Sequence, residues 1–115
     1  MIYDRGTIIL VYFPFSDHTT VKQRPALIVQ ANDARPSQRQ FIVAQITSNM
    51  NRAGPASRVV VRLRSSLAAG TELRTDSVIV MDNLATIHQS LIKGAIGKVP
   101  DMSLFDAALR ATLAL

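Results

Sequence analysis

The chain contains no cysteine, only eight acidic residues, and no apolar run close to the length of a membrane span. The absence of cysteine excludes disulfides, thiolate catalysis and zinc sites built on cysteine. A membrane-spanning helix needs about 20 successive apolar residues, and no segment offers them. The first residues also lack the basic, apolar and cleavage-site order of a secretory signal. We therefore expect a cytoplasmic protein that does not bind membranes.

The residues that are present suit one folded domain. The chain has 115 residues, 48% of them hydrophobic, which is long enough for a single core and too apolar for a disordered protein. No linker-like or repeated segment divides the chain. We expect one domain over residues 1–115.

Basic charge is concentrated in the middle of the sequence. Residues 22–64 carry eight Lys or Arg and a single acid, Asp33, whereas the remainder carries five basic and seven acidic residues. Ten of the 13 basic residues are Arg, the side chain best suited to bidentate phosphate contacts. The charge predicts a polyanionic partner, either a nucleic acid or an acidic protein. A solvated basic face without a partner is the alternative.

Most of the chain reads as β-strand. Continuous apolar and β-branched runs indicate strands with little exposed face, as in a closed or partly closed barrel. The expected strands are 7–13, 26–30, 41–47, 58–64 and 77–81, with a short sixth at 95–99. Polar loops are expected at 16–23, 32–40 and 48–57.

The period changes after Pro100. Leu104, Ala108, Ala111 and Leu115 recur at helical spacing, and Ser103 followed by Asp106 resembles a capping box. A second short helix is possible over 88–93, before Gly94. The predicted fold is a small, mainly β, mostly antiparallel barrel with a C-terminal α-helix.

Two strand boundaries carry the most suggestive chemistry. The segment 22–25 stands where a polar loop enters a strand, and 47–49 stands where another strand ends. Strand ends gather at the rim of a barrel, so Arg24 and Thr47 suit one groove that binds a phosphodiester: Arg neutralises the phosphate and the Thr hydroxyl hydrogen-bonds it. The alternative is structural: Arg24 pairs with an acid such as Asp17, and Thr47 simply ends a strand.

Histidine and metal chemistry have little support. An acid–base pair would need His18 and His88 in one site, and the alternative is that each is an ordinary loop or surface residue. No HExxH motif, EF-hand loop or carboxylate cluster is present. We expect no metal and no cofactor.

Several segments, taken together and in order, resemble the MazF/PemK toxins. They are Arg5-Gly6, residues 10–17, residues 22–29, Ile46-Thr47-Ser48, residues 75–78, residues 84–87 and residues 96–99 before the terminal helix. The match runs over nearly the whole chain. Two positions depart from the family pattern: Thr7 stands where Asp is usual after Gly6, and Ala85 stands where Arg is frequent.

The resemblance implies a toxin of a type II toxin–antitoxin pair, with an SH3-like barrel and a homodimeric assembly. Such toxins cut single-stranded RNA without metal and leave a 2′,3′-cyclic phosphate and a 5′-hydroxyl. A cognate antitoxin blocks the site with a flexible, often acidic tail. These properties are expectations for the present chain.

Carried over by position, Arg24 and Thr47 match the catalytic residues of the family. Arg24 would stabilise the phosphorane, since a guanidinium is a strong hydrogen-bond donor and a poor base; His18 is a candidate base. The expected RNA-binding residues are Ser16, Asp17, Lys22, Gln23, Ser48, Asn49 and Arg52.

Two other functions stay open on sequence grounds. The CcdB toxins share this architecture but poison DNA gyrase and cleave nothing. A non-catalytic barrel that binds nucleic acid would show salt-sensitive RNA binding without a cyclic-phosphate product.

Overall fold

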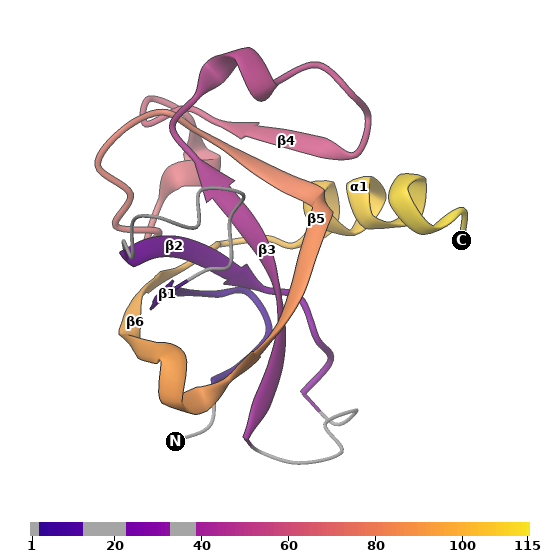
Figure 1. Ribbon diagram of the computed structural model, residues 1–115. Coiled ribbons are helices and arrows are strands. Elements are labelled where there is room, and N and C mark those ends of the chain that lie inside the picture. The colour runs from indigo at the N-terminus through magenta and orange to yellow at the C-terminus, as the bar shows by residue number, and fades with distance from the viewer. Residues whose placement is uncertain (1–2, 13–22, 33–38) are drawn as a thin grey trace.

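The computed structural model describes residues 3–12, 23–32 and 39–115. This part of the chain forms six strands, three short 3-10 helices and one α-helix (Figure 1). The strands are β1 Thr7–Tyr12, β2 Gln23–Ile28, β3 Gln40–Thr47, β4 Arg58–Val61, β5 Ser77–His88 and β6 Ile92–Lys98. The 3-10 helices are η1 Met50–Arg52, η2 Ser66–Ala68 and η3 Gln89–Leu91, and the helix is α1 Ser103–Leu113.

All six strands belong to one antiparallel sheet. Their order is β4-β5-β3-β2-β1-β6, and Figure 1 shows the sheet curving into a partly open barrel. The edge strand β6 meets the connection between β4 and β5, where the Lys98 N–H donates to the Gly70 carbonyl at 2.9 Å. The predicted mainly β barrel with a C-terminal helix is confirmed.

The sheet is buried on both faces, which explains the continuous apolar runs in the sequence. On β2, Leu27 packs into one core, whereas Ala26 and Ile28 pack into the other. Helix α1 covers the first core with Phe105 and Ala108, which are both almost fully buried. The second core lies on the opposite face of the sheet.

Strand β5 is the main correction to the predicted elements. It runs from Ser77 to His88, although the sequence predicted a strand ending at residue 81. The short helix that was possible over 88–93 is the 3-10 helix η3, Gln89–Leu91. Ala44 pairs with Leu84 but Gln45 pairs with Val80, so residues 81–83 form a bulge where β5 bends (Figure 1). The polar residues of this bulge interrupted the apolar run and made the strand look finished. After η3, β6 begins at Ile92, three residues earlier than predicted.

Other predicted boundaries shift for local reasons. The strand predicted over 58–64 ends at Val61, because the Leu63 N–H donates to the Asp76 carboxylate at 2.8 Å and turns the chain away. The predicted capping box is wrong: α1 has no side-chain cap from its N-cap residue, and Asp106 pairs with Arg5 instead. Asp101 accepts from the backbone N–H of Ser103 at 2.9 Å.

Candidate functional site

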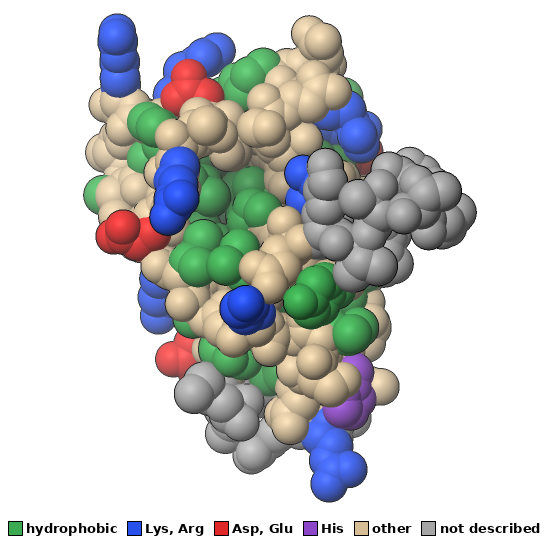
Figure 2. Space-filling view, turned by 60° about the vertical axis from the view of Figure 1, so that its left-hand side comes forward, with side chains coloured by type: hydrophobic (Ala, Val, Ile, Leu, Met, Phe, Trp, Pro, Cys, Tyr) green, Lys and Arg blue, Asp and Glu red, His purple; other side chains and the backbone are tan. Residues whose placement is uncertain are grey.

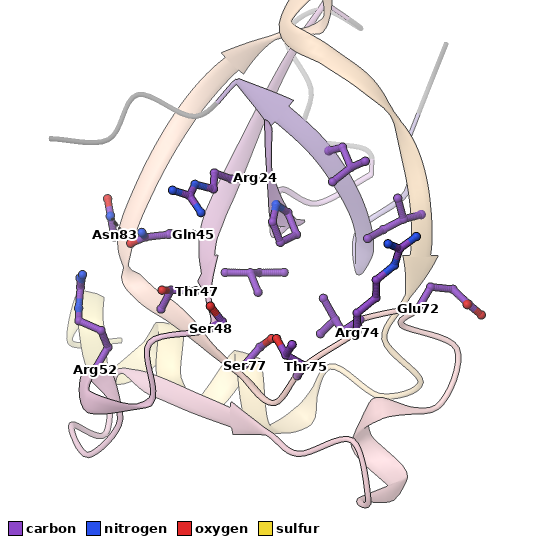
Figure 3. Close-up of a pocket in the computed structure, with 15 residues that line it drawn as sticks. Arg24, Gln45, Thr47, Ser48, Arg52, Glu72, Arg74, Thr75, Ser77 and Asn83 are labelled. Carbon is purple, nitrogen blue, oxygen red and sulfur yellow. Dashed lines mark hydrogen bonds between the residues drawn. The ribbon is translucent and has the colours of Figure 1, made fainter. Parts of the chain in front are cut away.

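One large pocket opens at the end of the sheet where β2 and β3 terminate their pairing and β5 bends. Its volume is about 1450 Å³, and polar residues make up much of its wall (Figure 3). The polar or charged lining residues are Arg24, Gln45, Thr47, Ser48, Arg52, Glu72, Arg74, Thr75, Ser77 and Asn83. Three arginines against one glutamate give the pocket a positive balance. Figure 2 shows one face of the molecule on which basic side chains outnumber acidic ones.

The strand ladder brings Arg24 and Thr47 to the same end of the sheet. Ala26 of β2 pairs with Gln45 of β3. Arg24 precedes Ala26 by two residues and Thr47 follows Gln45 by two, so antiparallel geometry puts both on the same face, just beyond the paired segment. Both side chains line the pocket in Figure 3. The structure thus gathers the two predicted catalytic residues, whose chemical roles stay predictions.

Local hydrogen bonds after β3 shape the next part of the wall. The Thr47 hydroxyl oxygen accepts from the Asn49 N–H at 3.1 Å, and the Asn49 side chain accepts from the Asn51 N–H at 3.1 Å. These bonds start η1, which ends at Arg52 and delivers its side chain to the pocket. The Asn49 N–H occupies one acceptor site of the Thr47 hydroxyl, which can still donate its own proton to a ligand.

The other predicted RNA-binding residues divide into three groups. Ser48 and Arg52 line the pocket. Asn49 caps η1 and is not among the lining residues, and Gln23 donates to the Tyr12 hydroxyl at 3.3 Å, also away from the pocket lining. The remaining predicted residues, Ser16, Asp17 and Lys22, lie outside the described residues, as does the candidate base His18.

His88 does not line the pocket. It ends β5, and its Nδ1 accepts from the Ser90 N–H at 3.1 Å. The alternative of an ordinary surface histidine therefore fits His88. Within the described ranges, no three His, Asp or Glu side chains lie together so as to hold a metal ion. None of the helices in those ranges is both long and apolar enough to cross a bilayer.

An ion pair at the start of β4 connects two segments that carry pocket-lining residues, η1 and the β5 bulge. Arg58, the first residue of β4, holds Asp82 of the β5 bulge through Nε–Oδ1 and Nη2–Oδ2 distances of 3.1 and 3.2 Å. Arg58 also donates from Nη1 to the Arg52 carbonyl at 2.9 Å. The hydrogen bond from the Arg58 guanidinium lowers the pKa of Asp82 below its ordinary value of 3.8. This bridge fixes η1 against the bulge.

Sequence reasoning missed several pocket residues. Gln45 is buried in β3, and its Oε1 accepts from the Asn83 amide at 2.6 Å. Its signal was a lone amide inside the apolar run 41–46. Asn83 sits in the polar break that hid the continuation of β5. Arg74 gave no signal, because its place depends on how the connection between β4 and β5 folds.

That connection forms the opposite wall of the pocket. Glu72 adopts the left-handed backbone conformation, with φ of 58°, next to the buried Thr71. Gly97 of β6 allows this wall to approach, because a Cβ there would collide with the carbonyl oxygens of Gly70 and Thr71. Residues 72–75 are thereby held against β6, with Arg74 facing the pocket in Figure 3.

Comparison with known proteins agrees with this architecture. A family model described as the PemK-like, MazF-like toxin of type II toxin–antitoxin systems matches residues 4–114. No curated protein sequence matches the chain significantly.

Solved structures with the same fold include proteins from mycobacteria and from Deinococcus radiodurans. The toxin MazF-mt6 of Mycobacterium tuberculosis has 25% identity and a TM-score of 0.73, over 95% of this chain and 97% of that chain. A mycobacterial endoribonuclease in complex with its cognate antitoxin has 20% identity and a TM-score of 0.74, over 98% and 96%. MazF from Deinococcus radiodurans has 18% identity and a TM-score of 0.71, over 100% and 99%.

The family model spans nearly the whole chain, and its match includes every segment that builds the pocket. The described fold, with its curved antiparallel sheet and C-terminal helix, is that of the MazF structures. This protein belongs to the PemK-like, MazF-like toxins of type II toxin–antitoxin systems.

Proposed function

We propose that the protein is a cytoplasmic, metal-independent endoribonuclease that cuts single-stranded RNA, mRNA included, at short specific sequences. The observation that carries the proposal is that Arg24 and Thr47, from neighbouring strands, line one positively charged pocket. Two mycobacterial structures with this fold are themselves described as endoribonucleases. Membership of the toxin family supports the same activity.

The reaction is an internal transfer at phosphorus. The 2′-oxygen attacks the adjacent phosphorus, its proton passes to a base, and the 5′-oxygen leaves with a proton to give a 2′,3′-cyclic phosphate and a 5′-hydroxyl. Arg24 stabilises the added negative charge on the phosphorane through its N–H donors. The Thr47 hydroxyl, oriented by the Asn49 N–H, donates to a phosphate oxygen and aligns it. His18 stays a candidate base, since an arginine is a poor proton acceptor.

The same pocket suits an acidic partner. A flexible, acidic segment of a cognate antitoxin would place carboxylates where the RNA phosphates lie, against Arg24 and Arg52. A relative of this fold was crystallised with its cognate antitoxin, and the Deinococcus MazF was crystallised with MazE. We propose that such a segment inhibits the toxin. We also propose that the toxin is a homodimer, and light scattering of the purified protein will test this oligomeric state.

The decisive experiment is mapping of RNA ends after incubation with the purified protein. We expect cleavage at defined sites, 2′,3′-cyclic phosphate and 5′-hydroxyl ends, and full activity in EDTA. Arg24→Ala and Thr47→Val should each lower the cleavage rate by about 100-fold or more, because each removes a group that stabilises the transition state. Both variants should keep the melting temperature within a few degrees.

Arg110→Ala is the matched control. Arg110 is an exposed arginine on α1 and does not line the pocket, so its loss changes charge without changing the site. Its cleavage rate should equal that of the unsubstituted protein. Cleavage by Arg24→Ala at the normal rate would refute the assignment, and loss of cleavage in EDTA would indicate a metal-dependent nuclease instead.

A further inference from the structure

A buried amide lies in the floor of the pocket beside the proposed catalytic pair. Gln45 is 8% exposed, yet it lines the pocket. It precedes Thr47 by two residues on β3, so the two side chains project from the same face of the strand, about 7 Å apart along it. In Figure 3, Gln45 lies between Arg24 and Thr47.

The Gln45 side chain is held in one orientation. Asn83 donates from Nδ2 to its Oε1 at 2.6 Å, and the β5 bulge brings Asn83 to this position. Among the described residues, the Gln45 Nε2 makes no hydrogen bond. The pair therefore offers N–H donors from Gln45, together with the Asn83 carbonyl oxygen, on the wall of the pocket.

A rigid amide pair next to a phosphate-binding group can recognise a nucleobase by hydrogen bonding. Gln and Asn amides pair with base edges through a donor and an acceptor, and proteins read unstacked single-stranded bases in this way. The step of about 7 Å between Thr47 and Gln45 suits one nucleotide, with its phosphate at Thr47 and its base at Gln45. Neither amide carries charge, so the pair adds discrimination between bases more than general affinity for RNA.

We infer that Gln45, positioned by Asn83, contacts one nucleobase of the bound RNA and sets the preferred base at one position of the cleavage site. This inference rests on the proposed function. Gln45 is then a specificity-determining residue, and Asn83 is a positioning residue that acts through it. The inference separates base selection at Gln45 from phosphate chemistry at Arg24 and Thr47.

The test is sequencing of RNA ends produced from a random RNA pool by the unsubstituted protein and by Gln45→Met. Methionine keeps the length of the side chain and removes its amide. We expect the preference at one nucleotide position to fall about tenfold, with the other positions unchanged. The rate on the variant's best sequence should stay within about threefold of the original rate.

Asn83→Ala and Gln40→Ala complete the design. Asn83→Ala should weaken the preference at the same position, and should add nothing in a Gln45→Met background, because Asn83 acts through Gln45. Gln40 is an exposed glutamine at the other end of β3 and lines no part of the pocket, so its variant should keep the original profile.

The outcomes separate the two claims. No cleavage by the unsubstituted protein refutes the proposed function and the base-reading role with it. Cleavage by Gln45→Met with an unchanged profile, whether at full or reduced rate, refutes the base-reading role alone. If Gln45→Met does not fold or does not cleave, the profile of Asn83→Ala decides, and an unchanged profile there overturns the inference.

Discussion

Asp82 shows how single residues place the pocket without lining it. Through Arg58 it connects the β5 bulge, the start of β4 and the carbonyl of Arg52. The two side chains are partly exposed, at 21% for Arg58 and 33% for Asp82, so solvent screens the pair. Its main effect is therefore geometric: it holds η1 so that Arg52 faces the pocket.

Asp82→Asn should be less stable than the unsubstituted protein by at most about 1 kcal/mol at pH 7, as expected for a partly exposed ion pair. The pKa of Asp82 is lowered in the folded state, so its contribution is present above pH 4 and disappears as the pH falls through the folded-state value. Urea unfolding at pH 7 and pH 3 will measure this. The difference between the two proteins should shrink at pH 3.

Arg58→Ala provides the control for this ion pair. Adding Asp82→Asn to Arg58→Ala should cost no further stability, because the partner is already absent. A full additional loss in the double variant, or a difference that grows at pH 3, contradicts the assignment of the pKa shift to Arg58.

At the residue scale, the sequence predicted the part of the site that has its own motif. Arg24 and Thr47 line the pocket, as the positions of the strand ends suggested, and so do Ser48 and Arg52, which were expected from the family resemblance. Asn49 does not, because its side chain caps η1. The sequence pattern does not show whether an Asn side chain binds the nearby backbone or a ligand. Other pocket residues come from a bulge and from a folded connection, whose places depend on tertiary contacts.

At the scale of elements, runs of apolar residues predicted all six strands approximately, but not their lengths. The failures share a cause. Polar residues inside β5 mark a bulge and not an end, and hydrogen bonds between segments distant in sequence decide where β4 stops. The periodicity of apolar residues indicates which residues are buried. The ends of the strands depend instead on hydrogen-bond partners that come close only in the folded chain.

Strand β6 contacts the connection between β4 and β5 so closely that no side chain fits at Gly97. Gly97→Ala should lower the free energy of unfolding by about 1–3 kcal/mol, because the new Cβ would collide with the carbonyl oxygens of Gly70 and Thr71. Since residues 72–75 form a wall of the pocket, RNA cleavage should also slow. Urea unfolding and a cleavage assay check both effects.

Gly94→Ala on the same strand is the matched control. A Cβ at Gly94 meets nothing within 4 Å, so stability should be unchanged or rise by up to about 1 kcal/mol. Equal effects of the two substitutions would show that glycine flexibility, and not the close approach at Gly97, governs this strand.

At the scale of the whole molecule, the structure shows where part of the net charge of +5 lies. Three arginines from separate elements line one pocket: Arg24 from β2, Arg52 from η1, and Arg74 from the connection opposite. Two of them belong to the basic segment 22–64, and Arg74 lies beyond it. The fold, more than the sequence interval, therefore determines where the positive charge meets a ligand.

This arrangement predicts how RNA binding depends on salt. Each phosphate contact to single-stranded RNA contributes a slope of about −0.7 in log K against log salt concentration, so three arginine contacts give about −2. Arg52→Ala should reduce that slope by about 0.7, whereas Arg110→Ala on α1 should leave it unchanged. Fluorescence anisotropy with a 2′-O-methyl oligonucleotide, which lacks the attacking hydroxyl, measures binding without cleavage. An unchanged slope for Arg52→Ala would refute a phosphate contact at Arg52, because removing the guanidinium from a bound phosphate must lose one counterion-releasing contact.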